Sequence, residues 1–204
     1  WHEGGAWVRY LTRCQFLLQE GRFAADVCLF AGEGAPSGAP HDPALKASGH
    51  DYDACNADVL IHRMSVKDGR LVLPDGMNYR VLVLPETRFM TPATLARLRD
   101  LVDEGATVVG PKPLRSPSLA DLPDGDARVR KLADELWGEC DGANVKEHAY
   151  GKGKIFWGRS VAEVLRTLEI APDCEFAGAF KPRMAWIHRV EDGADVYFVS
   201  NQRP

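Results

Sequence analysis

Several features that would point directly to a chemistry are missing from this chain of 204 residues. It has only five cysteines, and no two of them lie at the C-x-x-C spacing of a zinc site or a redox pair. The six histidines are scattered, without the H-E-x-x-H pattern of a metalloprotease. A formal net charge of −4 argues against nucleic acid as a partner, because binding the phosphate backbone needs a basic face. No apolar run reaches the length of a membrane-spanning helix, so no membrane partner is expected either.

The bulk composition is that of an ordinary globular domain, with 45% hydrophobic and 26% charged residues. This length is enough for one well-buried domain with appendages. Cys14 and Cys28 lie within apolar patterns, and we expect both to be buried free thiols. Few disulfides are therefore expected, which favours a reducing compartment without establishing one.

The most informative stretch runs over residues 65–113, where the sequence predicts a hairpin followed by a strand, a crossover helix and a second strand. Residues 81–84 (VLVL) are typical of a strand buried on both faces. Thr91 and Pro92 fit the N-cap and the first position of a helix that Gly105 ends. The apolar stripe of that helix recurs at helical spacing: Leu95, Leu98, Leu101 and Val102. With a strand at 107–109, this is a βαβ unit, which requires parallel strands.

The rest of the chain continues the alternation of strands and helices. We expect helices at 7–19, 56–64, 126–137 and 161–168, strands at 23–30, 80–84 and 154–157, a hairpin at 66–73 turned by Asp68-Gly69, loops at 31–49 and 116–125, and a tail hairpin of 185–188 with 196–200. Ser160 and Glu163 fit a capping box. The alternation predicts an α/β fold with a doubly wound, mostly parallel sheet, a flavodoxin-like three-layer sandwich of the kind also found in class I glutamine amidotransferases.

Ligands of such folds bind outside the carboxyl ends of the strands. We therefore place Glu33, Asp51, Asp53, Glu86 and Lys112 near that edge, with Asn56 beside the aspartates. The aspartates are candidate oxygen ligands for a cation or acceptors for sugar hydroxyls, although EF-hand spacing is absent. The alternative is that they cap the helix that follows.

Glu33 and Glu86 also suit a glycosidase acid and base if their carboxylates lie close together, whereas the alternative makes them plain loop charges. Residues 151–154 (GKGK) lack the Walker pattern and precede a strand, so a turn is favoured over a phosphate site. No cysteine follows a strand in the Gly-x-Cys-x-Gly pattern of an amidotransferase nucleophile. The sequence thus predicts no metal site, no cofactor and no catalytic residue of its own.

Taken together, several segments resemble one family, the bacterial α-L-rhamnosidases of glycoside hydrolase family 106. The segments that carry the resemblance, each weak alone but specific in their order, are 10–15, 17–21, 25–27, 32–33, 51–53 with Asn56, 65–85, 133–138, 151–153 and 196–201. Trp1 stands without an initiator methionine or signal peptide before it, and Pro204 closely follows a strand-like stretch. We therefore expect a piece of a longer bacterial protein. Cytoplasmic, periplasmic and secreted locations all stay open.

The resemblance implies a particular order of domains. Residues 1–21 would be the last helix of an upstream catalytic barrel, 22–180 the flavodoxin-like domain, and 181–204 the start of a following β domain. The catalytic glutamates, and a calcium site, would lie upstream of Trp1. The implied role is an accessory domain that braces the barrel and edges its cleft, with those neighbouring domains as its partners. The alternatives are a free-standing module for carbohydrate or another small polar ligand, and a homo-oligomerisation domain like that of family-42 β-galactosidases.

Overall fold

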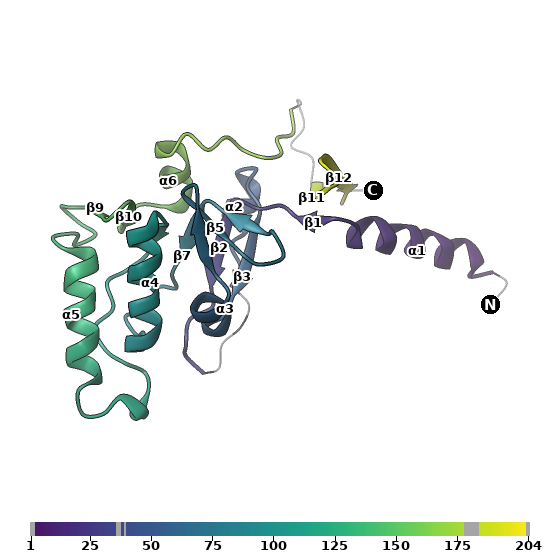
Figure 1. Ribbon diagram of the computed structural model, residues 1–204. Helices are drawn as coiled ribbons and strands as arrows, with labels where there is room; N and C mark the ends of the chain where they lie inside the picture. The colour runs from purple at the N-terminus through teal and green to yellow at the C-terminus, as the bar shows by residue number, and fades with distance from the viewer. Residues whose placement is uncertain (1–2, 36–37, 39, 178–183, 203–204) are drawn as a thin grey trace. The chain divides into compact units, whose positions relative to one another are not determined.

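The computed structural model describes residues 3–35, 38, 40–177 and 184–202 (Figure 1). Contacts within the chain separate two compact units. The first unit combines Trp1–Ala24 with Cys174–Pro204, and the second is Ala25–Asp173. The domain boundaries expected after residues 21 and 180 stay predictions.

The second unit is built on a six-stranded sheet in the order β3-β2-β7-β8-β10-β9. Its strands are β3 (Tyr52–Cys55), β2 (Val27–Phe30), β7 (Val81–Val83), β8 (Thr107–Val109), β10 (Gly153–Phe156) and β9 (Glu147–Tyr150). The pairs β2–β3, β2–β7, β7–β8 and β8–β10 are parallel, and only β9 pairs antiparallel, with β10. The sheet is therefore mixed.

Both faces of this sheet are apolar and covered by helices. Cys28 and Phe30 of β2 belong to one core, whereas Val27 and Leu29 belong to the other, because successive side chains of a strand point to opposite faces. The first core also takes side chains from α3 (Ala57–His62), α4 (Pro92–Glu104) and α5 (Gly125–Trp137), and the second from α2 (Pro43–Ala47) and α6 (Val161–Thr167). The doubly wound, flavodoxin-like assignment stays a prediction.

The predicted βαβ unit is confirmed in detail. The Thr91 hydroxyl accepts the backbone N–H of Thr94, Pro92 opens α4, and Gly105 ends it with φ of 129°. The four residues of the predicted stripe are fully buried against the sheet, and β7 and β8 pair in parallel. Burial of this stripe explains why a 13-residue helix forms here.

A small antiparallel sheet precedes the βαβ unit: β4 (Ser65–Lys67), β5 (Arg70–Val72) and β6 (Asn78–Tyr79). Asp68 and Gly69 have φ of 52° and 71°, the left-handed conformation that a two-residue hairpin turn requires. The predicted hairpin is therefore confirmed. Tyr79, at 3% exposure, joins the first core.

The expected strand at 23–30 is wrong as a single element. Residues 22–23 form β1 (Arg22–Phe23), which pairs with β11 in the first unit, and only Val27–Phe30 enters the large sheet. After the break, the carbonyl of Asp26 accepts the N–H groups of Arg80 and Val81, where the ladder of the large sheet begins.

Two expected loops also contain helices, and three strands were not predicted: β3, β6 and β9. Asp42 caps α2 within the 31–49 loop, and the 3-10 helix η1 (Leu119–Asp121) lies within the 116–125 loop. Strand β9 was not predicted from its sequence EHAY, which is an edge strand with alternating exposure. The turn interpretation of Gly151 and Lys152 is confirmed, because they join β9 to β10.

The first unit combines α1 (Gly5–Gln19) with a three-stranded sheet in the order β1-β11-β12. The predicted tail hairpin is confirmed and longer, with β11 (Met184–Glu191) and β12 (Ala194–Asn201) joined at Asp192-Gly193. The Arg189 guanidinium donates to the carbonyls of Gln19, Glu20 and Gly21, which satisfies the end of α1. No residue of α1 is buried, so the expectation of a buried Cys14 is wrong, whereas Cys28 is buried as expected.

Candidate functional site

Glu33 follows β2 at the carboxyl edge of the sheet and accepts hydrogen bonds from the amino end of α4. Its Oε2 accepts the backbone N–H of Thr91 at 2.8 Å, and its Oε1 accepts the hydroxyls of Thr91 and Thr94 at 2.8 and 2.7 Å. A carboxylate at this position is favoured by the helix dipole and by the unpaired N–H groups of the first turn. Glu33 is therefore a structural acceptor across 58 residues of sequence rather than a free loop charge.

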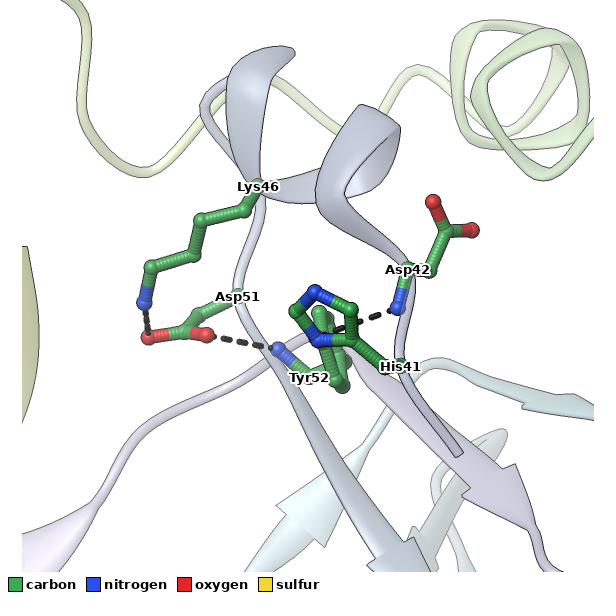
Figure 2. A network of polar contacts seen from close by, with 5 residues as sticks. All are labelled: His41, Asp42, Lys46, Asp51 and Tyr52. Atoms are coloured by element: carbon green, nitrogen blue, oxygen red, sulfur yellow. Dashed lines mark hydrogen bonds and ion pairs between the residues drawn. The ribbon is translucent and has the colours of Figure 1, made fainter. Parts of the chain in front are cut away.

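Asp51 lies at the other edge of the sheet, so its placement at the carboxyl edge was wrong. It directly precedes β3, and it is 4% exposed. Figure 2 shows its partners: the Lys46 ammonium forms an ion pair with Oδ2, and the backbone N–H of Tyr52 donates to Oδ1 at 3.0 Å. The pair fixes α2, which carries Lys46, to the start of β3.

The Tyr52 hydroxyl continues this network (Figure 2). Its oxygen accepts the backbone N–H of Asp42 at 3.1 Å and lies 2.8 Å from Nδ1 of His41. The donor of the Tyr52–His41 hydrogen bond depends on the tautomer of the His41 ring. Asp42 in turn accepts the N–H of Leu45 and caps α2. These contacts anchor a short helix to the start of β3.

Asp53 lies inside β3 and bridges the two sheets of the second unit. Its Oδ2 accepts the Tyr79 hydroxyl at 2.8 Å, and its Oδ1 accepts the N–H of Ala54. Burial, together with this hydrogen bond, raises the pKa of Tyr79. On the same face, a hydrogen bond with Cys55 and burial raise the pKa of Cys28, so this thiol is held in its inert, protonated form.

The remaining candidates lie at the carboxyl edge without meeting one another. The Asn56 side chain accepts the N–H of Val59 and caps α3, which agrees with the alternative of a helix cap. Lys112 pairs with Asp134 at 2.7 Å. Glu86 is exposed after β7, and no hydrogen bond or ion pair holds it among the described residues. The hypothesis that these residues bind a ligand stays a prediction.

Sequence reasoning missed one open, polar pocket at the carboxyl end of β10. It has a volume of about 480 Å³ and is lined by Lys146, Gly158, Arg159, Glu163, Arg166 and Thr167. Its cations are partly balanced, because Arg159 pairs with Glu147 at 3.3 Å. The N–H and hydroxyl of Ser160 donate to Glu163 and lower its pKa, so a carboxylate is retained inside the lining. Such a pocket can contact small polar groups but offers no paired acid and base.

Two further classes of site are absent from the part of the chain that the structure describes. No group of three or more His, Cys, Asp or Glu side chains there is arranged to hold a metal ion. No helix in those ranges combines the length and the apolar content needed to cross a membrane.

Comparison with known proteins gives a consistent result. A curated relative from Formosa agariphila, described as a "Putative beta-glucuronidase", is 37% identical over 203 residues, which is 100% of this chain and 16% of that protein. The structure of a rhamnosidase from Novosphingobium sp. PP1Y superposes with a TM-score of 0.80 at 30% identity, over 96% of this chain and 19% of that chain. This chain therefore spans less than a fifth of the length of either relative.

The family comparison covers the chain from end to end. The family model described as alpha-L-rhamnosidase, glycoside hydrolase family 106, matches residues 1–204. This agrees with the resemblance carried by the sequence segments and with the superposition on a solved rhamnosidase. The chain belongs to glycoside hydrolase family 106.

Proposed function

We propose that this chain is a non-catalytic accessory domain of a longer glycoside hydrolase that acts on α-L-rhamnosides. Its work is to brace the catalytic barrel that precedes it and to edge the substrate cleft. Residues 1–21 supply the last helix of that barrel, and residues 181–204 begin a following β domain. The relatives, of which this chain spans 16% and 19%, support a longer parent.

The observation that carries the proposal is that α1 exposes its apolar side chains to solvent. The helix is rich in large apolar side chains, yet none of its residues is buried. Its exposed apolar residues are Trp7, Val8, Tyr10, Leu11, Phe16 and Leu17, of which Trp7 and Phe16 are 62% and 61% exposed. A helix with so much apolar surface requires a covering partner, because tertiary packing supplies most of the stability of a helix in water.

The strand order supports the flavodoxin-like part of the proposal. Counted along the chain, the parallel strands β2, β3, β7, β8 and β10 lie in the spatial order 2-1-3-4-5, which is the order of flavodoxin-like sheets. The helices on both faces fit the same arrangement.

The carboxylates support a non-catalytic role. Glycosidases need two carboxyl groups facing one glycosidic bond. Here Glu33, Asp51 and Asp53 are each committed to a helix end, a lysine or a tyrosine, and Glu86 stands alone.

The test compares hydrolysis of an aryl α-L-rhamnoside by this chain and by the longer protein that contains it. An aryl β-D-glucuronide serves as the second substrate, because one relative is described as a glucuronidase. We expect the longer protein to cleave the rhamnoside and this chain to cleave neither. Rhamnoside cleavage by this chain alone would contradict the accessory role, and a longer protein that cleaves only the glucuronide would contradict the substrate class.

A further inference from the structure

The polar pocket at the carboxyl end of β10 gathers cations from three separate segments. Lys146 comes from the loop before β9, Arg159 from the loop after β10, and Arg166 from α6. A single carboxylate, that of Glu163, lies among them, so the lining is net positive although the whole chain carries a formal charge of −4. A hollow lined mainly by one sign of charge raises the local concentration of ligands with the opposite sign.

Contacts with neighbouring residues hold the two arginines of the pocket in place. The Arg159 guanidinium pairs with Glu147 through Nη2 at 3.3 Å, and its Cζ lies over the Phe156 ring, 5.5 Å from the ring centroid. The Arg166 side chain donates from Nε to the carbonyl of Ala162 at 3.3 Å. Each contact uses one nitrogen of a guanidinium that carries several N–H donors. The donors that remain suit an oxyanion, which arginine binds through two parallel hydrogen bonds.

The pocket also offers oxygen acceptors, which a bare anion does not need. Glu163 accepts the backbone N–H and the hydroxyl of Ser160, both through Oε2 at 2.8 Å. Its Oε1 accepts no hydrogen bond from the described residues. The Thr167 hydroxyl donates to the carbonyl of Glu163 at 2.9 Å, which leaves the hydroxyl oxygen as a second acceptor. A carboxylate repels an inorganic anion at close range but accepts hydrogen bonds from ligand hydroxyls. Donors for an acid group and acceptors for hydroxyls therefore line the same pocket.

The size and the position of the pocket fit a small organic ligand. Its volume of about 480 Å³ lies within the range of pockets that hold such ligands. It lies beyond the carboxyl end of β10, which pairs in parallel with β8, and open α/β sheets bind ligands outside the carboxyl ends of their strands.

We propose that this pocket binds a hydroxylated organic acid of monosaccharide size. The acid group lies among Lys146, Arg159 and Arg166, and ligand hydroxyls donate to Glu163. The inference goes beyond the proposed function and does not rest on it, because it assigns the chain a ligand of its own and no part in catalysis.

The test follows acetylation of lysines by a small dose of acetic anhydride in the longer protein, read by mass spectrometry of single peptides. The probe is D-glucuronate at about 20 mM, with D-glucose as its uncharged analogue and sodium sulfate as the bare anion, all at one ionic strength. Lys131 of α5 is the internal control, because it is exposed and lies outside the lining. We expect D-glucuronate to slow acetylation of Lys146 about threefold and to leave Lys131 unchanged. D-Glucose should have no effect on Lys146, and sulfate should slow its acetylation less than D-glucuronate does.

Two arginine variants connect this protection to the pocket. Arg166→Gln removes one cation from the lining and keeps Lys146 as the reporter, so we expect D-glucuronate to lose its effect there. Arg130→Gln is the matched control, because Arg130 is an exposed arginine of α5 outside the lining and its loss changes the net charge equally. We expect this control to keep the protection. In the wild type, about 0.5 M NaCl should also remove the protection, since salt screens exposed charges, and this arm needs no variant.

Each outcome decides the proposal. It would be overturned by unchanged acetylation of Lys146, by equal slowing at Lys131, or by equal slowing with D-glucose. Sulfate that protects as strongly as D-glucuronate would show a site for a bare anion and would overturn the organic ligand. Protection that survives Arg166→Gln or the high salt concentration would overturn the charge contacts assigned to the acid group. None of these arms measures catalysis, so the proposed function stands or fails separately.

Discussion

At the scale of single residues, several carboxylates of this chain organise the backbone around them. Asp141 shows this most clearly: one of its oxygens accepts the N–H groups of Ala143, Asn144 and Val145 in the loop between α5 and β9. The N–H of Ala143, then the side chain of Asn144, lower the pKa of Asp141 to about 2. These hydrogen bonds order the loop that leads into the edge strand β9.

This lowered pKa predicts a pH dependence of stability. A carboxyl group with a lower pKa in the folded state stabilises the fold above its ordinary value of 3.8 and loses that contribution as the pH falls toward about 2. We expect Asp141→Asn to lower the free energy of unfolding at pH 6, and the difference from wild type to shrink in that acid window. Urea denaturation at several pH values measures this, and a difference that is constant with pH would contradict the assignment.

The role assigned to Glu33 predicts an effect on stability in the absence of any ligand. Glu33→Gln removes the charge at the amino end of α4 and one or more of its three hydrogen bonds, and we expect a loss of about 1 to 2 kcal/mol. Glu86→Gln is the matched control at the same edge, with an expected change within about 0.5 kcal/mol because Glu86 is exposed. Equal effects of the two substitutions on the urea midpoint would refute the capping role.

At the scale of elements, the loop before β9 and the loop after β10 approach each other closely at two glycines, Gly142 and Gly158. A Cβ on Gly158 would lie 1.8 Å from the carbonyl oxygen of Gly142, so the two loops can approach only without that atom. Gly158 and Gly69 have almost the same left-handed backbone, with φ of 75° and 71°, but a Cβ on Gly69 would meet nothing within 4 Å. Alanine substitutions at Gly69 and Gly158 therefore separate the free-energy cost of backbone strain, which both share, from the cost of a steric clash, which only Gly158 adds.

We therefore predict different losses for the two alanine substitutions. Gly69→Ala should cost about 1 kcal/mol, the cost of a left-handed non-glycine residue. Gly158→Ala should cost at least about 2 kcal/mol more, since the backbone of two loops must separate. Thermal or urea unfolding of both variants gives the comparison, and similar losses would show that the loops move apart without penalty.

The same elements show what sequence could and could not predict. The Asp68-Gly69 turn, the Thr91-Pro92 start of α4 and the Ser160–Glu163 capping box were predicted because each is decided by residues within a few positions. The pairing of β1 with β11 and the bond from Tyr79 to Asp53 join distant segments, and no local pattern encodes them. The roles of Glu33 and Asp53 were not predicted, because their partners Thr91 and Tyr79 are distant in the sequence.

At the scale of the whole molecule, membership of glycoside hydrolase family 106 places this chain among enzymes far longer than itself. Glu33, Asp51 and Asp53 of the second unit are each engaged by hydrogen-bond donors or a lysine. The exposed apolar face of α1 calls for a partner. We therefore propose that catalysis belongs to the rest of the longer protein and that this part supports it.

The most direct test of that division measures the kcat of the longer protein on an aryl α-L-rhamnoside. The residue to substitute is Glu86, the glutamate at the carboxyl edge of the sheet for which the structure shows no partner among the described residues. We predict that Glu86→Gln, measured beside Glu33→Gln at a temperature where both variants stay folded, leaves kcat within about twofold of wild type. A fall of 100-fold or more in either folded variant, on the scale lost when a catalytic acid or base is removed, would contradict the account.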